Sequence, residues 1–257
     1  KNDIDLKKLS GRKYDVIIDT SGRNLQDTQR VISQTGHPLS RFLYISSAGV
    51  YQKSEILPIE EHFPIDGHSR HIGKALTENW LREEGIKFTS FRPTYIYGPG
   101  NYNPIEKWFF DRIIHNRPIP IPDSGDTITQ LGHVYDLSRA MIRSLQSDIA
   151  INKIYNCSGK KSITFRGLAS VAAKACQKDP NEVELKSFNP NSVDSKARKS
   201  FPLRIENFFT DISLAELELD WKETFNVQSG FDDSFKNDYL INRTTNIDFS
   251  SDEKLIG

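Results

Sequence analysis

Two cations, one helical turn apart, are the first residues of this sequence that could do chemistry. Arg70 and Lys74 lie in the stretch SRHIGKALTENW, residues 69–80. Ser69 can cap the start of a helix, and the apolar residues recur at a spacing of four: Ile72, Leu76 and Trp80. We therefore predict a helix with Arg70 and Lys74 on one face. A guanidinium with a pKa above about 12 keeps its proton near neutral pH, so Arg70 cannot act there as a general base.

Hydroxyl, imidazole and phenol groups close to this helix are further candidates. Ser46 and Ser47 end the apolar run RFLYISSAGVY, either as small residues at a tight strand end or as groups that face a nucleotide. His71 titrates near neutral pH, but one residue of helix is a rotation of about 100°, so we expect His71 to face away from Arg70. Tyr51 could be proposed as a base, and Lys74 could be a solvated helix lysine. Asp66, His68 and His71 suggest a metal site, but without a Cys or a third ligand at firm spacing we interpret them as a polar helix start.

Composition limits the class of protein. The chain has 257 residues, 34 basic and 34 acidic side chains, 37% hydrophobic residues and 26% charged residues. These values are typical of a globular protein with one or two packed domains, and no run approaches the ~18 apolar residues that cross a bilayer. Zero net charge means that any RNA surface would be a local patch. The two cysteines, Cys157 and Cys176, have no motif spacing and are interpreted as small buried hydrophobes.

The first 92 residues alternate between β-rich and helical patterns. Residues 14–19, 41–51 and 86–93 read as strands, while residues 24–35 and the helix that ends near Gly85 read as helices. This alternation predicts a parallel sheet covered by helices, with right-handed crossovers.

After residue 93 the pattern changes, with Tyr, Asn and Pro crowded in PTYIYGPGNYNP. Residues 133–145 and the segment opened by Thr164 are predicted helices, KIYNCSG is a predicted strand, and RPIPIP is extended because of its prolines. We expect residues 184–210 to be irregular and basic, SLAELELDW to form a short helix, and the acidic tail after Asn246 to be weakly structured.

Four stretches, in order, resemble the extended short-chain dehydrogenase/reductase family of sugar-nucleotide epimerases and dehydratases. They are YISSAGVY, FRPTYIYGPGN, LGHVYDLSRAM and IYNCSG. The resemblance implies an α/β fold: a doubly wound parallel sheet of the Rossmann type, with its first βαβ units missing, and a smaller C-terminal lobe that binds substrate. The implied domains are residues 1–92 for the remaining Rossmann-type part and residues 93–257 mainly for the lobe, with residues 132–146 returning to the first domain.

The resemblance also implies an NAD(P) site and a catalytic set that this chain matches in part. Ser47 and Lys74 match the family's catalytic serine and lysine, and Arg70 stands where its tyrosine belongs. The implied cofactor contacts are Thr20, Ser21, Ser46, Lys74, Pro93 and Tyr95. The G-x-G-x-x-G loop for the pyrophosphate is absent. Because the first strand corresponds to the family's fourth, we expect the missing units upstream of Lys1.

Within this family, the chain is most similar to the chloroplast stem-loop-binding proteins and their cyanobacterial relatives, on SRHIGK, NYNPIEKWFFDRI, RPIPIPDSGDTITQLGHVYDL and FPLRIENFFTD. That resemblance implies a protein of the chloroplast stroma or the bacterial cytoplasm that binds RNA, with RNA cleavage as a further candidate activity and a homo-oligomer as a candidate assembly. Candidate RNA contacts are Arg70, Lys107, Arg112, Arg117, Lys196, Arg198, Lys199 and Arg204, with Tyr95, Tyr97, Tyr102 and Trp108 for stacking. The alternatives are an NAD(P)-dependent sugar-nucleotide epimerase or dehydratase with a relocated base, and a catalytically silent dinucleotide-binding scaffold.

Overall fold

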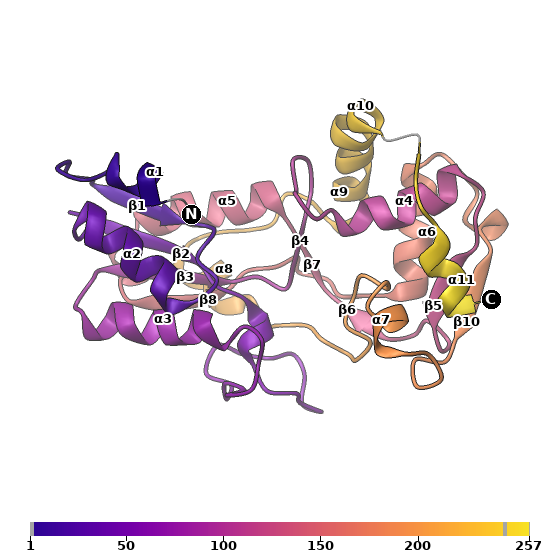
Figure 1. Cartoon of the computed structure of the whole chain (residues 1–257), viewed down its shortest axis with the longest axis horizontal. Coiled ribbons are helices and arrows are strands. Elements are labelled where there is room, and N and C mark those ends of the chain that lie inside the picture. The colour runs from indigo at the N-terminus through magenta and orange to yellow at the C-terminus, as the bar shows by residue number, and fades with distance from the viewer. Residues whose placement is uncertain (1–2, 244–245, 257) are drawn as a thin grey trace. The chain divides into compact units, whose positions relative to one another are not determined.

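A computed structural model describes residues 3–243 and 246–256, and the chain divides into two compact units (Figure 1). Unit 1 contains residues 1–94, 137–157 and 210–222. Unit 2 contains residues 95–136, 158–209 and 223–257. Each unit is therefore assembled from three separate stretches of the sequence.

Unit 1 is built on a parallel sheet of four strands. The strands are β1 (Val16–Asp19), β2 (Arg41–Ile45), β3 (Phe88–Arg92) and β8 (Lys153–Asn156), in the spatial order β1-β2-β3-β8. All residues of β2 and β3 are buried, as expected for inner strands covered on both faces. Since all four strands run in the same direction, their carboxyl ends meet at one edge of the sheet.

Helices cover both faces of this sheet. They are α1 (Asp3–Lys7), α2 (Leu25–Thr35), α3 (Ile72–Glu83), α8 (Ser213–Glu218) and most of α5 (Val134–Leu145), with short turns η1 (Ala48–Val50) and η2 (Asp148–Ala150). Helices α2 and α3 lie on one face and α5 on the other (Figure 1). Phe42, Tyr44 and Phe88 pack with Ile32 of α2 and Leu81 of α3 to form a core on the α2–α3 side.

Unit 2 contains three two-stranded sheets and a cluster of helices. The strands are β4 (Tyr95–Tyr97) with β7 (Leu131–His133), β5 (Ile119–Pro122) with β10 (Leu185–Phe188), and β6 (Ile128–Thr129) with β9 (Ile163–Thr164). The helices are α4 (Ile105–Ile114), α6 (Phe165–Ala175), α7 (Ser195–Arg198), α9 (Val227–Ser234), α10 (Leu240–Asn242) and α11 (Ser250–Ile256), with η3 (Pro180–Glu182) and the π-helix η4 (Phe235–Tyr239). Phe109, Phe110, Phe165 and Phe231 are fully buried in its core.

Helix α3 begins later, and buries a different face, than the sequence predicted. His71 is its N-cap residue, whereas Ser69 lies in the preceding turn and its hydroxyl accepts a hydrogen bond from the His71 N–H. The buried residues include Ala75, Glu78 and Leu81, while Leu76 is 48% exposed. The spacing of four identified a helix correctly, but the inward face also carries Glu78, whose carboxylate forms a buried ion pair with Arg92.

Two further expectations for the C-terminal half were wrong. Residues 184–210 contain the strand β10, which pairs with β5, and the helix α7. The tail after Asn246 contains helix α11, whose Asp252 forms a buried ion pair with Arg112 of α4. Arg112 also packs over the Trp108 ring, at 3.5 Å from the ring centre, and is therefore a structural residue. Within residues 3–243 and 246–256, none of the helices has the length and apolar character needed to cross a membrane.

Candidate functional site

Polar residues follow three neighbouring strands of unit 1 at the carboxyl edge of its sheet. Asp19 ends β1 and is followed by Thr20 and Ser21, Ser46 and Ser47 follow β2, and Pro93 follows β3. In open parallel sheets, ligands bind at this edge. The structure therefore brings together the cofactor candidates predicted in unit 1, whereas Tyr95 belongs to unit 2.

Asp19 fixes the loop after β1, and sequence analysis did not single it out. Its Oδ1 atom accepts hydrogen bonds from the N–H groups of Ser21, at 3.0 Å, and Gly22, at 2.8 Å, and its Oδ2 atom accepts from the Thr28 hydroxyl at 3.0 Å. A Cβ atom on Gly22 would lie 2.6 Å from Asp19 Oδ2, so a larger residue here would displace the Asp19 carboxylate. An acidic residue directly after an apolar strand, followed by Ser-Gly, was the available signal in the sequence.

The two serines after β2 have different surroundings. The Ser46 N–H donates to the Phe91 carbonyl at 2.7 Å, and its hydroxyl is buried without a hydrogen bond to any described residue. The Ser47 hydroxyl accepts a hydrogen bond from the Gly49 N–H at 3.1 Å and so caps the short helix η1. Ser46 thus presents an unsatisfied polar group at the edge, which is costly unless a ligand or water completes it.

Lys74 reaches this edge from α3. Its ammonium donates to the carbonyl of Ile45 at 2.7 Å and to the carbonyl of Gly22 at 3.0 Å, and it lies 5.2 Å from the centre of the Tyr44 ring. Tyr44 also donates its hydroxyl to the Gly22 carbonyl at 3.1 Å, and burial raises its pKa. Lys74 is therefore anchored between the ends of two strands, and the interpretation as a solvated helix lysine is wrong.

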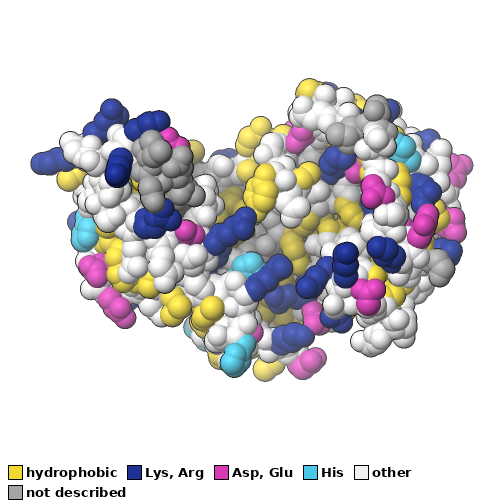
Figure 2. Space-filling view, in the orientation of Figure 1, with side chains coloured by type: hydrophobic (Ala, Val, Ile, Leu, Met, Phe, Trp, Pro, Cys, Tyr) yellow, Lys and Arg dark blue, Asp and Glu magenta, His cyan; other side chains and the backbone are white. Residues whose placement is uncertain are grey.

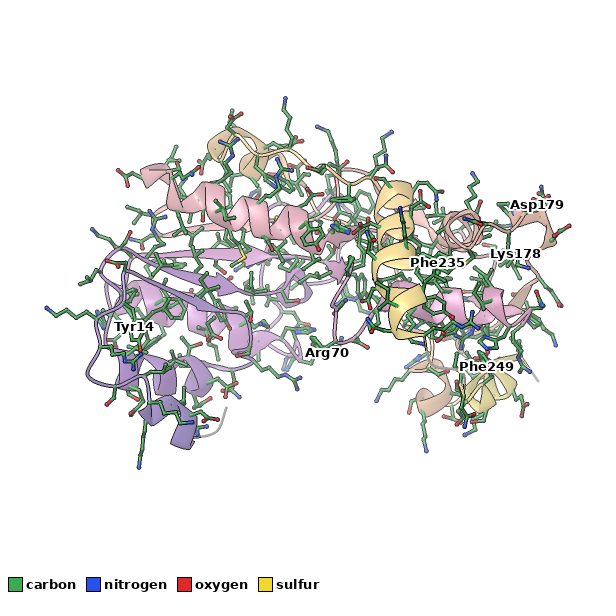
Figure 3. The ribbon with its side chains drawn as sticks, turned by 90° about the horizontal axis from the view of Figure 1, so that it is seen from above. Tyr14, Arg70, Lys178, Asp179, Phe235 and Phe249 are labelled. Atoms are coloured by element: carbon green, nitrogen blue, oxygen red, sulfur yellow. The ribbon has the colours of Figure 1, made fainter. Side chains whose placement is uncertain are left out.

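Arg70 and His71 contact one another, contrary to the sequence prediction. The Arg70 Nε donates to Nε2 of His71 at 3.0 Å. Both residues precede the first helical residue, Ile72, so the rotation of 100° per residue does not separate them. Figure 3 labels Arg70, which is exposed on the turn before α3.

A buried network beneath the edge holds β3 and α3 together. Arg92 donates through Nε to Glu78 Oε1 at 3.1 Å and through Nη2 to Oε2, and the Ser90 hydroxyl donates to Oε1 at 2.7 Å. The guanidinium lies 4.9 Å from the centre of the Tyr51 ring. Tyr51 donates its hydroxyl to Asn156 at 2.8 Å, and burial raises its pKa to about 12. The Tyr51 phenol is therefore protonated at neutral pH.

Comparison with known proteins identifies the family. The sequence profile of the NAD dependent epimerase/dehydratase family matches residues 10–158. The chloroplast stem-loop binding protein of 41 kDa b from Arabidopsis thaliana is 41% identical over 261 residues, which cover 100% of this chain and 68% of that protein. The chain belongs to the epimerase/dehydratase family. The family resemblance inferred from the four motifs is confirmed.

Solved structures show the same fold at low sequence identity. An epimerase from Methanothermobacter thermautotrophicus superposes with a TM-score of 0.75 at 18% identity, covering 93% of this chain and 77% of its own. A dTDP-glucose 4,6-dehydratase from Streptomyces venezuelae, solved with NAD bound, gives 0.72 at 18% identity and covers 94% and 78%. The predicted Rossmann-type α/β class is thus confirmed for this member of the epimerase/dehydratase family.

The cations singled out for RNA have unequal surroundings in this epimerase/dehydratase member. Lys196, Arg198 and Lys199 are exposed, on α7 and at its end. Lys107 is paired with Asp111, at 2.7 Å from both carboxylate oxygens. Arg204 stacks on the Phe208 ring at 4.3 Å. Where unit 2 faces the viewer in Figure 2, Lys and Arg side chains lie near one another with a few acidic side chains among them.

The aromatic candidates are mostly engaged in packing. Tyr97 is 1% exposed, and Trp108 packs edge-on against Phe201. The Tyr95 hydroxyl accepts a hydrogen bond from the Arg204 N–H at 2.7 Å. Tyr102 is 91% exposed, so it is the candidate whose ring face is open to a base. Among the residues that the structure describes, there is no group of three or more His, Cys, Asp or Glu side chains that could hold a metal ion.

Proposed function

We propose that this chain binds RNA and that it lacks the redox chemistry of the epimerases and dehydratases in its family. The observation that carries the proposal is 41% identity, along the whole chain, with a chloroplast protein named for stem-loop binding. We also propose the chloroplast stroma or a bacterial cytoplasm as its compartment, because that relative is chloroplastic.

The geometry around Arg70 supports the proposed loss of redox chemistry. Abstracting a proton from a sugar hydroxyl requires a base whose pKa lies near the working pH. Arg70 occupies the position four residues before Lys74 and stays charged. Tyr44 lies beside Lys74, and Tyr51 lies beside Arg92. Burial raises the pKa of both phenols, so neither supplies a phenolate near pH 7.

Phosphate attraction by exposed cations is the interaction we propose for RNA. Lys196, Arg198 and Lys199 surround the buried Ala197, so the fold directs all three cations outward. Binding through such cations releases counterions and weakens steeply as salt rises. Looped or single-stranded RNA should bind more tightly than a duplex, because only unpaired bases can stack on a ring such as Tyr102.

A gel-shift with a labelled stem-loop RNA tests this proposal. The triple variant Lys196→Ala, Arg198→Ala, Lys199→Ala should weaken binding and reduce the slope of log K against log salt by about 2, from ~0.7 per lost phosphate contact. The matched control removes three exposed cations of unit 1, Arg12→Ala, Lys13→Ala and Lys87→Ala, and should leave the slope unchanged. If the unaltered protein fails to retain the RNA at low salt, the proposal is wrong. A denaturing gel of the same RNA reports any cleavage.

Dinucleotide binding is the second candidate function. The family is described as NAD dependent, and the edge of unit 1 offers groups that suit the nicotinamide-ribose half: the unsatisfied Ser46 hydroxyl and the anchored Lys74. For the pyrophosphate, the sequence contains no G-x-G-x-x-G loop. We therefore propose that this chain alone binds NAD weakly. Calorimetry with NAD and NADP tests this, since micromolar binding that Lys74→Met abolishes would contradict it.

A further inference from the structure

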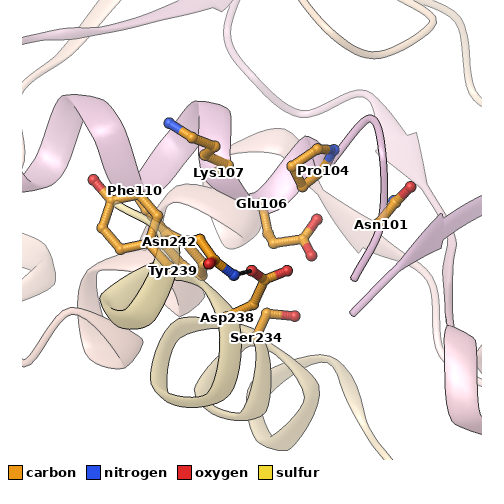
Figure 4. A pocket seen from close by; sticks show the side chains of 9 residues that line it. All are labelled: Asn101, Pro104, Glu106, Lys107, Phe110, Ser234, Asp238, Tyr239 and Asn242. Atoms are coloured by element: carbon orange, nitrogen blue, oxygen red, sulfur yellow. Dashed lines mark hydrogen bonds between the residues drawn. The ribbon is translucent and has the colours of Figure 1, made fainter. Parts of the chain in front are cut away.

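A cavity in unit 2, outside the candidate site at the sheet edge of unit 1, has the features of a ligand site. Its volume is about 190 Å³, and it lies between the start of α4 and the α9–η4–α10 segment (Figure 4). The lining residues are Asn101, Pro104, Glu106, Lys107, Phe110, Ser234, Asp238, Tyr239 and Asn242. All nine belong to unit 2.

Glu106 is the most unusual of these residues. It is only 2% exposed, and one of its oxygens, Oε1, accepts a hydrogen bond from the Gly98 N–H at 2.8 Å. Its other oxygen, Oε2, makes no hydrogen bond of ordinary geometry to any described residue, and neither does the Ser234 hydroxyl, which lies close enough to favour the ionised carboxyl. A buried carboxylate oxygen without a well-aligned donor is costly, and the Glu106 side chain is part of the cavity lining.

Asp238 supplies a second carboxylate from a π-helical turn. Its Oδ2 atom accepts a hydrogen bond from the Gly100 N–H at 2.7 Å, and its Oδ1 atom accepts from the Asn242 amide at 2.7 Å. The π-helix comprises Phe235–Tyr239, so Asp238 and Tyr239 both lie on it. Such turns are rare and occur frequently at functional sites.

The lining has an excess of negative charge. Lys107 is a cation, but its ammonium is paired with Asp111 and points away from Glu106 in Figure 4. That pair cancels, which leaves the Asp238 carboxylate and Glu106, whose raised pKa makes its charge depend on pH. The Lys107 ammonium lies 5.5 Å from the centre of the Tyr239 ring, and Pro104 adds aliphatic surface. Anions such as phosphate are disfavoured beside these carboxyl groups.

We propose that this cavity binds a small organic cation, an ammonium or guanidinium on a short apolar stem. The charge of the cation compensates both carboxylates, and its stem lies against Pro104 in the lining. The cavity volume suits a ligand of a few carbon atoms. This inference goes beyond the proposed RNA binding and does not depend on it.

Binding of a cation should release protons from Glu106. Burial raises the pKa of this carboxyl, the Gly98 N–H and the Ser234 hydroxyl oppose that shift, and the negative charge of Asp238 adds to it. A bound cation favours the ionised form. Protons are therefore released on binding, and calorimetry in buffers of different ionisation enthalpy measures how many.

Four probes of equal stem length test the proposal on the full chain: butylammonium, butylguanidinium, butanol and butyrate. We expect saturable binding of at least one cation, at least tenfold tighter than butanol, and no binding of butyrate. Comparing butylammonium with butylguanidinium shows which of the two headgroups the cavity prefers. Glu106→Gln should weaken the cation at least tenfold, and Asp238→Asn severalfold. The control Asp232→Asn, an exposed carboxylate on α9, should stay within twofold.

Glutamine at position 106 can still accept the Gly98 hydrogen bond, so the variant should fold, and its thermal unfolding checks this. If it does not fold, Asp238→Asn and the comparison of the four probes on the unaltered protein still decide. Equal affinity for butanol and both cations, binding of butyrate, or unchanged affinity in folded Glu106→Gln would each overturn the proposal.

Discussion

Replacing Glu78 with alanine should cost unit 1 several kcal/mol of stability. The substitution removes three hydrogen-bond acceptor interactions, two from Arg92 and one from Ser90, and leaves a buried guanidinium without its counterion. The side chains of Arg92 and Glu78 are 5% and 1% exposed, so water cannot readily replace the lost partner. Breaking such a pair from one side costs about 3–5 kcal/mol.

This free energy corresponds to a clear thermal shift. At about 2–4 °C per kcal/mol for chains of this size, the midpoint of unfolding should fall by roughly 6–20 °C. Urea unfolding followed by circular dichroism, together with calorimetry, measures both quantities. Glu83→Ala, an exposed carboxylate on the same helix, is the matched control and should change stability by no more than about 0.5 kcal/mol.

A double substitution distinguishes the cost of an uncompensated buried charge from the cost of lost packing. Adding Arg92→Met to Glu78→Ala removes the uncompensated charge and should recover part of the lost stability. The reasoning fails if Glu78→Ala lowers the free energy of unfolding by no more than Glu83→Ala does. It also fails if the double variant loses more free energy of unfolding than the two single variants lose together. Since α3 also carries Lys74, the same substitution should loosen the candidate site in unit 1.

Three other changes have defined outcomes. Gly22→Ala should destabilise unit 1 by about 1–3 kcal/mol in urea unfolding, because its Cβ would clash with Asp19. Burial raises the pKa of Glu106, so its protonation stabilises the folded state below the unfolded pKa, and this contribution is lost as pH rises through the folded pKa. Glutamine does not titrate, so the stability of Glu106→Gln relative to the unaltered protein should rise above pH 4.5. Thermal unfolding between pH 4 and 9 measures this difference. Asp252→Ala should leave Arg112 unpaired and speed proteolysis within α11; unchanged cleavage would contradict this.

The strands and main helices could be predicted because their signals are local. Apolar runs gave β1, β2 and β3, and Thr164 caps α6 by accepting a hydrogen bond from the Gly167 N–H, as its sequence pattern indicated. Strand β10 was missed because three of its four residues are exposed, so no apolar run marks it. Its place depends on backbone pairing with β5, more than 60 residues away.

The same distinction applies to the candidate sites. Ser46, Ser47 and Lys74 could be placed at one edge, because strand ends and helix positions follow from pattern. The partners of Glu78, Glu106 and Arg112 could not be predicted, since each contact depends on how separate elements pack. Arg70 and His71 were misjudged because a helix start that differs by two residues changes every direction inferred from the helical rotation.

The interleaving of the two units has a consequence for biosynthesis. The chain passes between unit 1 and unit 2 five times, at residues 94, 136, 157, 209 and 222. Strand β8, which completes the four-stranded sheet, emerges from the ribosome only after all of α4 and β5 have been made. Helix α8, whose Glu218 accepts hydrogen bonds from Lys153 and Tyr155, emerges later still. The last segment of unit 1, residues 210–222, follows most of unit 2, so a nascent chain carries two incomplete hydrophobic cores at once until that segment has been synthesised.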